Sequence, residues 1–349
     1  MSPQVKHAKE DITLKDIAEV VGKSVAAVSR ALNDYDDISE ETRAHIKQVA
    51  RELGYAPNPM AQRLRKRTTD TLGLILPVFS AKNFDPYFSE LLAGIANEAT
   101  AHGFDLLVST CSPGQVEIQA YQRLILGRRV DGIIVTRPRW QDPRIKLLLS
   151  KQFPFVVVGD GDLPAHIPAV TDDTASGARL MVDHLVGQGH EQIALVNAPS
   201  ELVFSSKYFS GFQQAMIKAG FSVNETFLEE SNFSQKEGYR AGQTLLSRAE
   251  IPTAIITADD IIGLGVMAAA QDQGFEIGHD LAVTGYGDIL LSEYSQPPLT
   301  TIHRPTYTLG QRACRMMIDQ LHGETLTETQ VVFEPSLVIR QSSDLALWL

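Results

Sequence analysis

Residues 13–33 read TLKDIAEVVGKSVAAVSRALN, two short amphipathic segments joined at a glycine. Thr13 is a residue type that favours helix N-caps, so a first helix is expected over residues 14–21. Gly22 supplies a sharp turn, and Ser24 can cap a second helix over residues 25–33. The apolar residues have the spacing that packs two such helices together, namely Ile17, Ala18, Val21, Val28 and Leu32. The stretch therefore predicts a helix-turn-helix, whose second helix lies in the major groove of DNA.

A third helix is expected over residues 43–53, capped by Ser39 and ended by Gly54. Three helices alone are equally compatible with a small bundle that binds no nucleic acid. The residues that follow, 55–67, read YAPNPMAQRLRKR and favour DNA binding, because a cap residue, a proline at a first helical position and a basic run occur together.

The helix expected from Pro59 onward is too short to be stable alone in water. We expect it to fold on DNA, with Leu64 as an apolar wedge in a minor-groove base step. Arg63 and Arg65 would contact phosphates on either side of it. A solvated basic linker is the alternative interpretation of the same run.

The charge of the chain is unevenly placed. The formal net charge is −11, yet residues 1–67 carry 12 lysines and arginines against 10 acidic residues, and residues 68–349 carry 19 against 32. A local basic excess is what a DNA contact needs, whatever the sign of the remainder. Two cysteines in 349 residues, with no signal-peptide pattern and no apolar run of membrane-spanning length, predict a cytoplasmic protein that does not enter a membrane.

From residue 71 onward, short apolar runs alternate with amphipathic segments. Continuous apolar runs are typical of buried parallel strands, and their alternation with helices indicates βαβ units. Seven runs carry the pattern, at residues 72–78, 104–109, 132–136, 155–158, 192–197, 253–257 and 281–286. The stretch is too long for one sheet of ordinary size, so we expect two doubly wound parallel-sheet lobes, with a ligand cleft at the carboxyl ends of the strands.

The strings TLKDIAE, AVSRALN, ISEETR and LGYAPNPMAQRL, in this order, resemble the lactose/galactose repressor family of bacterial transcription regulators. The resemblance extends over nearly the whole chain and implies three parts: a helix-turn-helix head at 1–57, a hinge helix and linker at 58–70, and an effector-binding and dimerisation core at 71–349. It also implies that the core has the fold of periplasmic sugar receptors. Lobe 1 would comprise residues from about 71 to 159 and from 300 to 340, and lobe 2 residues from about 160 to 299.

The resemblance implies which residues contact DNA. Val25 and Ala26 would face the bases, where small apolar side chains can read thymine methyl groups. Arg30 is expected on a guanine or a phosphate, and the remaining polar residues on phosphates, which position the head. The full expected set is Thr13, Ser24, Val25, Ala26, Ser29, Arg30, Asn33, Asn58, Met60, Ala61, Arg63, Leu64 and Arg65.

The effector site is expected where strands end. A sugar needs aromatic faces for its ring, and carboxylates, amides or arginines for its hydroxyls. The expected set is Tyr87, Phe88, Thr136, Asp160, Tyr208, Phe233, Asp259 and Asp288. The resemblance places aromatic side chains at 87, 88 and 233 near the ligand and Asp259 in contact with it, whereas simple packing is the alternative for each aromatic.

Two positions depart from the family's pattern. Tyr208 stands where many members carry an arginine, and Gly287 where many carry an aspartate, so that Asp288 is left alone. The first change removes a bidentate carboxylate partner, and the second lowers the penalty for an anion. We therefore expect a neutral sugar or a short oligosaccharide, with a sugar acid or a purine as the alternative.

Other classes of protein find little support in the sequence. It contains no phosphate-binding loop, no dinucleotide fingerprint, no paired metal-ligand histidines and no evident Ser-His-Asp set. We expect no enzyme activity, no cofactor and no metal, and regard a sugar receptor without a regulatory role as the second interpretation and an α/β enzyme as the third. No heptad tail is present, so a homodimer on a near-palindromic operator is expected.

Overall fold

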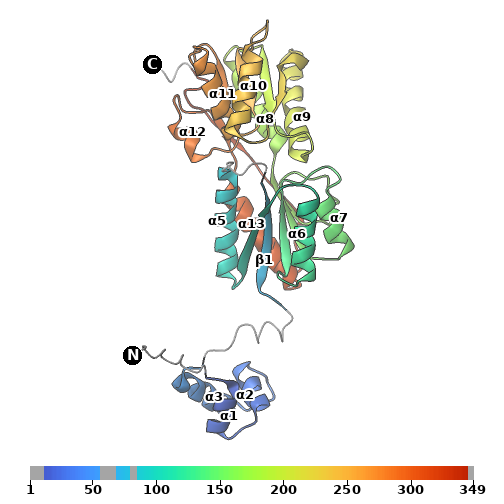
Figure 1. The fold of residues 1–349 in the computed structure, drawn as a ribbon, viewed down its shortest axis with the longest axis vertical. Coiled ribbons are helices and arrows are strands. Elements are labelled where there is room, and N and C mark those ends of the chain that lie inside the picture. The colour runs from blue at the N-terminus through green and yellow to red at the C-terminus, as the bar shows by residue number, and fades with distance from the viewer. Residues whose placement is uncertain (1–11, 56–67, 79–84, 345–349) are drawn as a thin grey trace, which may run out of the picture. The chain divides into compact units, whose positions relative to one another are not determined.

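The structure is a computed structural model that describes residues 12–55, 68–78 and 85–344. The chain divides into two compact units, Met1–Thr68 and Thr69–Leu349, which are called the head and the core and are described separately (Figure 1).

The head is built from three helices, α1 (Leu14–Val21), α2 (Val25–Leu32) and α3 (Glu40–Leu53). The backbone N–H and the hydroxyl of Thr13 both donate to the Asp16 carboxylate, at 2.7 Å each, and Ser24 and Ser39 accept N-cap hydrogen bonds. Gly22 has a φ of 64°, the left-handed conformation that glycine adopts without strain. The expected helix pair, caps and turn are therefore confirmed, whereas the third helix begins at Glu40, three residues earlier than expected.

All three helices contribute to the small hydrophobic interior of the head. Its fully buried centre contains Ile17, Val28 and Ile46. Val21 and Leu32, expected in this core, pack against it while partly buried. The apolar contacts fix α2 against α1 and α3, so that the opposite face of α2 is left to solvent.

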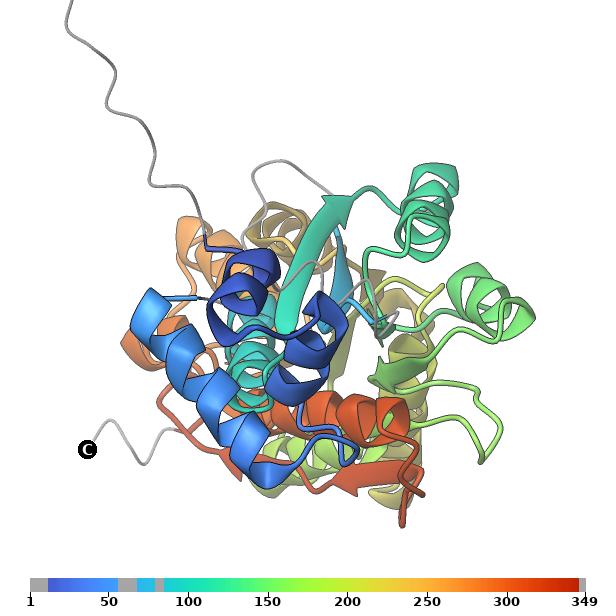
Figure 2. The same ribbon diagram turned by 90° about the horizontal axis from the view of Figure 1, so that it is seen from below.

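The core contains a six-stranded sheet in the order β11-β5-β4-β3-β1-β2, with all neighbouring strands parallel. Helices α5 and α13 pack together on one face, and α6 and α7 lie on the other (Figure 1, Figure 2). The elements are β1 (Thr71–Pro77), α5 (Pro86–Ala101), β2 (Asp105–Cys111), α6 (Gln115–Leu126), β3 (Gly132–Thr136), α7 (Pro143–Ser150), β4 (Phe155–Val158), β5 (Ala169–Asp172), α13 (Thr306–Leu321) and β11 (Gln330–Phe333).

A second, four-stranded parallel sheet has the order β7-β6-β8-β9. Helices α8 and α9 form one packed pair, and α10 and α11 form another. The elements are α8 (Thr174–Gly187), β6 (Ile193–Asn197), α9 (Val203–Lys218), the 3-10 turn η1 (Glu225–Phe227), β7 (Leu228–Glu230), α10 (Gln235–Leu246), β8 (Ala254–Thr257), α11 (Asp260–Asp272), β9 (Ala282–Thr284) and α12 (Leu290–Tyr294).

A short antiparallel pair, β10 (Thr301–His303) and β12 (Ser336–Val338), completes the core. After β12 the chain returns to the second sheet, where the Val283 N–H donates to the Ser342 carbonyl at 2.9 Å. The expected two-lobed α/β architecture is thus confirmed by the two parallel sheets. None of the helices in the described part of the chain combines the length and apolarity of a transmembrane span.

The lobe limits differ from those expected in two places. The expected boundary near residue 160 falls before β5, yet β5 pairs with β4 and β11 in the first sheet, so the segments of the second lobe begin at α8. Residues 341–344 lie against the second lobe after the expected end of the last strand. The sequence did not reveal β5 because its residues, AVTD, form no continuous apolar run and the strand finds its place through non-local pairing.

Candidate functional site

The exposed face of α2 carries the residues expected on DNA bases. Val25 and Ala26 lie in its first turn and are exposed, although Val25 is a large apolar side chain. Ser29 is half-buried, and the Asn33 amide donates to the Ser29 carbonyl at 2.5 Å, which closes the end of the helix. This arrangement leaves a small, apolar tip at the N-terminus of α2, where a recognition helix meets base edges.

Arg30 is held on the surface of the head by an acidic turn. Its guanidinium lies 2.9 Å from the Asp37 carboxylate and 5.4 Å from the centre of the Tyr35 ring. The neighbouring Asp34 pairs instead with Lys47, at 2.5 Å. Both members of the Arg30–Asp37 pair are about half exposed, so the bond is weak and exchangeable. Arg30 can therefore leave Asp37 for a base or a phosphate.

The other expected DNA contacts lie outside the described residues. They are Asn58, Met60, Ala61, Arg63, Leu64 and Arg65.

In the core, the carboxyl ends of the strands meet around a partly open cavity of about 30 Å³. Four expected effector residues line it together, namely Tyr87, Asp160, Phe233 and Asp259. They come from the first turn of α5, the end of β4, the segment before α10 and the N-cap of α11. Segments of both lobes therefore contribute to one site.

Arg137 occupies the centre of the aromatic group at this cavity. It follows β3 with a φ of 48°, and its guanidinium donates to the Asp85 carboxylate at 2.6 Å. The guanidinium carbon lies 3.8 Å from the centre of the Phe233 ring and 4.8 Å from that of Phe88. A planar cation on an aromatic face fills the space that the flat side of a sugar ring would use.

Two further ion pairs border the cavity. Arg304 donates to the buried Asp172 carboxylate at 2.6 Å, which also accepts a hydrogen bond from the Tyr286 hydroxyl. Lys207 donates to Asp160 at 2.8 Å. Within the described residues, each of the three cations at the cavity thus has a carboxylate partner.

Asp259 is the carboxylate that has no cationic partner of this kind. One of its oxygens accepts from the Ile261 N–H at 2.8 Å, the N-cap bond of α11. Burial raises the pKa of Asp259 well above its usual value, and the negative charge of Asp85 acts in the same direction. The protonated form is therefore more stable than in a solvent-exposed aspartate, and once protonated Asp259 can donate a hydrogen bond to a hydroxyl.

Four expected effector residues do not line the cavity. Phe88 lies behind the Arg137 guanidinium, and Thr136 is fully buried in β3. Tyr208 is fully buried as well, because Phe204 stacks on it at 5.5 Å and faces the cavity in its place. Asp288 is held away by Arg340, at 2.7 Å, and by His303, at 3.0 Å.

Sequence reasoning missed several lining residues. Arg304 follows the crossover strand β10, and no local pattern signals that this strand ends beside the cleft. Phe204 lies in the first turn of α9, four residues before Tyr208, and therefore on the same face of the helix. Arg137 was visible at the end of the third apolar run but was not included in the expected set.

Arg137 belongs to a segment that bridges the lobes. The Trp140 N–H donates to the Glu201 carbonyl at 3.1 Å, and the Val203 N–H donates to the Pro138 carbonyl at 3.2 Å. Arg139 and Leu202 form an antiparallel bridge between these two bonds. The first lobe and the start of α9 are therefore joined by main-chain hydrogen bonds beside the cavity.

A buried ionic network around Arg144 fixes the backbone of the segment that contains Arg137. Arg144 is fully buried and pairs with Asp142 at 2.6 Å and with Glu117 at 3.3 Å. Its guanidinium also donates to the carbonyls of Thr136, at 3.1 Å, and Arg137, at 2.9 Å. The network thus fixes the backbone that presents Arg137 to the cavity.

Asp260, the neighbour of Asp259, predicts a pH effect on stability. Burial raises its pKa to about 6, although hydrogen bonds from the Thr301 hydroxyl at 2.5 Å and the Ile289 N–H at 2.9 Å oppose the shift. The folded protein holds this proton more tightly than the unfolded chain does. The ionised carboxylate therefore destabilises the fold above pH 6, and this destabilisation disappears as the pH falls from about 6 to about 4.

The substitution Asp260→Asn should remove this dependence. Relative to the variant, the wild type should gain about 3 kcal/mol of unfolding free energy between pH 7 and pH 4. Urea unfolding of both proteins at several pH values measures the difference. Parallel pH profiles would show that the carboxyl of Asp260 does not titrate in this range.

Comparison with known proteins places these features in a family. Residues 13–58 match the model "Bacterial regulatory proteins, lacI family", and residues 182–343 match "Periplasmic binding protein-like domain". The HTH-type transcriptional regulator AglR of Rhizobium meliloti (strain 1021) is 32% identical over 336 residues, which cover 95% of this chain and 94% of AglR.

Solved structures agree. A structure of the transcriptional regulator CelR in complex with cellobiose has a TM-score of 0.75 and 29% identity, and covers 95% of this chain and 100% of its own. The Lac repressor dimer bound to operator and the anti-inducer ONPF has a TM-score of 0.81 and 29% identity, and covers 96% and 100%. Head and core together define a DNA-binding transcription regulator. The chain belongs to the LacI family of bacterial regulatory proteins.

Proposed function

We propose that this regulator responds to a neutral sugar bound between its lobes. The observation that carries the proposal is the charge balance of the cavity. Arg137, Arg304 and Lys207 are each paired with a carboxylate, and burial raises the pKa of Asp259. Each of these three cations at the cavity is therefore already neutralised, which disfavours an anionic effector, whereas aromatic faces and polar groups suit a sugar.

The cavity is too small to hold a sugar as it stands. We propose that the sugar ring takes the place of the Arg137 guanidinium on the face of Phe233. Arg137 would remain paired with Asp85 and would turn its free N–H groups towards hydroxyls. Because the segment around Arg137 also bridges the lobes, the exchange changes the angle between them.

The experiment is calorimetry with neutral monosaccharides and disaccharides, sugar acids and purines, measured side by side on the full chain. The expected result is that a neutral sugar binds and that the sugar acids and purines give no heat of binding. Binding of sugar acids alone would reject the proposal. Purines alone would assign the site to the alternative class of effector.

Phe233→Ala should weaken sugar binding by about 2 kcal/mol, roughly 30-fold, because the aromatic face and its buried area are lost. Phe209→Ala is the matched control, since Phe209 is a partly buried phenylalanine of the same apolar core that does not line the cavity. Titration calorimetry measures both variants. Equal losses would show that Phe233 acts through packing alone.

We propose that the protein acts on DNA as a homodimer, with one head on each half of a near-palindromic operator. An exposed apolar face on α12 supports pairing of two cores, since Leu290 and Tyr294 are 72% and 70% exposed there. Sedimentation of the full chain as a monomer at micromolar concentration would contradict this pairing. In each head, Thr13, Ser24, Ser29 and Asn33 would position α2 on phosphates.

Residues 58–65, which lie outside the described residues, would complete the operator contact. The proposal assigns the central wedge to Leu64, phosphate contacts to Arg63 and Arg65, and the remaining hinge contacts to Asn58, Met60 and Ala61. Leu64→Ala should weaken operator binding by about 1–3 kcal/mol while leaving sugar affinity unchanged. Anisotropy titrations with operator DNA measure the first effect and calorimetry the second. Unchanged operator affinity would eliminate the wedge.

A further inference from the structure

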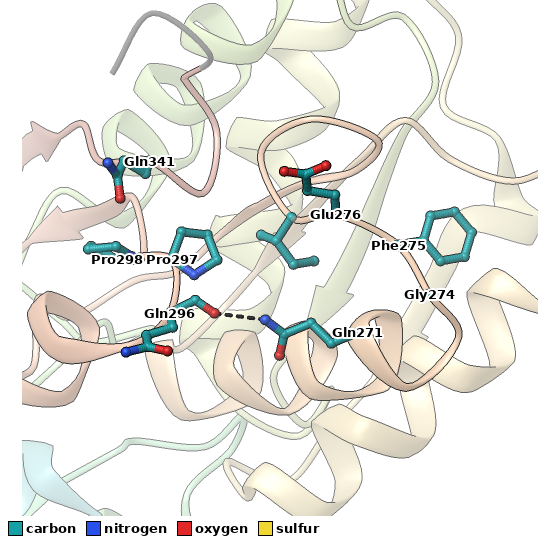
Figure 3. A pocket seen from close by; sticks show the side chains of 9 residues that line it. Gln271, Gly274, Phe275, Glu276, Gln296, Pro297, Pro298 and Gln341 are labelled. Atoms are coloured by element: carbon teal, nitrogen blue, oxygen red, sulfur yellow. Dashed lines mark hydrogen bonds between the residues drawn. The ribbon is translucent and has the colours of Figure 1, made fainter. Parts of the chain in front are cut away.

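A groove on the second lobe, away from the cavity, takes no part in the DNA binding or sugar binding proposed above. It has a volume of about 620 Å³, within the range of about 300–1,000 Å³ that ligand sites occupy. Its apolar lining comes from Phe275, Ile277, Pro297 and Pro298, and its polar lining from Gln271, Glu276, Gln296 and Gln341 (Figure 3). We call it the Phe275 groove.

The walls of the Phe275 groove are fixed by hydrogen bonds. The Gln271 side-chain amide donates to the Gln296 carbonyl at 2.7 Å, which joins the end of α11 to the proline segment (Figure 3). Gly274 has a φ of 86°, and the Phe275 N–H bonds back to the Ala270 carbonyl at 3.0 Å. The groove is thus part of the framework of the lobe.

The chain itself passes the groove shortly before its last residues. Gln341 lines the groove, and the next residue, Ser342, is bonded in both directions to Val283, with its carbonyl at 2.9 Å and its hydroxyl at 2.6 Å. Ser343 is held by Thr300, at 2.7 Å. The residues that follow Asp344 therefore start from an anchored point close to the groove.

Those last five residues, 345–349, read LALWL. They carry no charged side chain and contain three leucines and a tryptophan, an apolar run whose exposure to water is unfavourable. Five extended residues span about 17 Å, which is enough to double back to a groove that Gln341 already lines. The groove offers apolar walls for the side chains, and its polar lining offers donors and acceptors for the backbone.

We propose that residues 345–349 occupy the Phe275 groove of their own chain, with Trp348 against Phe275. A tethered segment reaches such a site at an effective concentration in the millimolar range, which favours it over the same segment of a second copy. The docked segment joins the crossover end of the chain to the last turn of α11. It therefore braces the second lobe.

The chain offers a direct reporter, because Trp140 and Trp348 are its two tryptophans. In a Trp140→Phe background, Trp348 is the single tryptophan of the full-length protein. Its emission should be shifted to the blue relative to the urea-unfolded chain. Its quenching by acrylamide should be about threefold weaker than in the unfolded chain, because a docked indole is shielded from solvent.

Phe275→Ser in the same background should return Trp348 to solvent and restore the quenching. Phe221→Ser is the matched control: Phe221 also follows a glycine in the left-handed conformation at a helix end, and it packs partly buried against the same core. The control should leave Trp348 unchanged. Circular dichroism verifies that both variants are folded.

A cross-link provides a second measurement that does not depend on Phe275. Cysteines introduced by Gln271→Cys and Leu347→Cys should form a disulfide within one chain, seen as a mobility change without a rise in mass. An emission of Trp348 equal to that of the unfolded chain would overturn the proposal. So would equal effects of Phe275→Ser and Phe221→Ser, or a blue shift and a disulfide that appear only as protein concentration rises, since these would place the segment on a second copy.

Discussion

Replacing Arg144 by methionine should lower the free energy of unfolding of the core by about 3–5 kcal/mol, because it leaves the buried Asp142 carboxylate without its cation. Glu117 and Asp142 are almost inaccessible to solvent, and Arg144 pairs with both, whereas Arg139 pairs with Glu117 alone. The same substitution removes the donors to the Thr136 and Arg137 carbonyls. Sugar affinity should therefore fall together with stability.

Urea unfolding and calorimetry on one preparation measure both effects. Arg315→Met is the matched control, since the Arg315–Asp319 pair on α13 is partly exposed and worth about 1 kcal/mol or less. If Arg144→Met cost no more than this control, the network would be unimportant for the fold. Lost stability with unchanged sugar affinity would separate the network from the presentation of Arg137.

Replacing Arg30 by alanine should weaken operator binding by about 1–3 kcal/mol and relax the preference at one base pair of each half-site. Replacing Asp37 by asparagine should act in the opposite direction. It removes the carboxylate that holds Arg30 at 2.9 Å in the free head, and it should tighten binding by up to about 1 kcal/mol. Anisotropy titrations on a selected duplex and its single-base variants measure both substitutions.

Asp34→Asn separates two possible causes of tighter operator binding, namely the release of Arg30 from its carboxylate partner and a weaker general repulsion of the DNA phosphates. It removes the same charge from the same turn, but Asp34 pairs with Lys47 and not closely with Arg30. A larger gain from Asp37→Asn than from Asp34→Asn is the expected result. Equal gains would reduce the effect of Asp37 to general repulsion of phosphates. An unchanged base preference in Arg30→Ala would place Arg30 on a phosphate.

The elements that sequence reasoning found are those with a local signal. The caps at Thr13 and Ser24 and the turn at Gly22 are set by neighbouring residues, and the seven apolar runs correspond to β1, β2, β3, β4, β6, β8 and β9. The strands β5, β7, β10 and β11 were not among these runs, and their place in the sheets depends on pairing across the chain. Their position, and with it the lobe limits, follows from packing that a single sequence does not display.

The same distinction applies to the effector site. Asp160 follows β4, where the rule that sites lie at the carboxyl ends of strands predicts a ligand contact. The resemblance to the family predicted Tyr87, Phe233 and Asp259. Tyr208 was expected on the ligand side of its helix, but Phe204 covers it. Of the two arginines at the cavity, Arg137 directly follows the third apolar run and could have been included, whereas Arg304 follows the crossover strand β10 and has no local sequence pattern.

The most direct test measures, in one titration, how sugar binding by the core changes DNA binding by the head. Fluorescence anisotropy of a duplex from upstream of the protein's own gene is measured at fixed salt, because phosphate contacts make affinity strongly salt-dependent. We expect specific binding whose affinity changes by about 5–150-fold when a neutral sugar is added, in either direction. A sugar that binds the core without altering the affinity for this DNA would contradict this expectation.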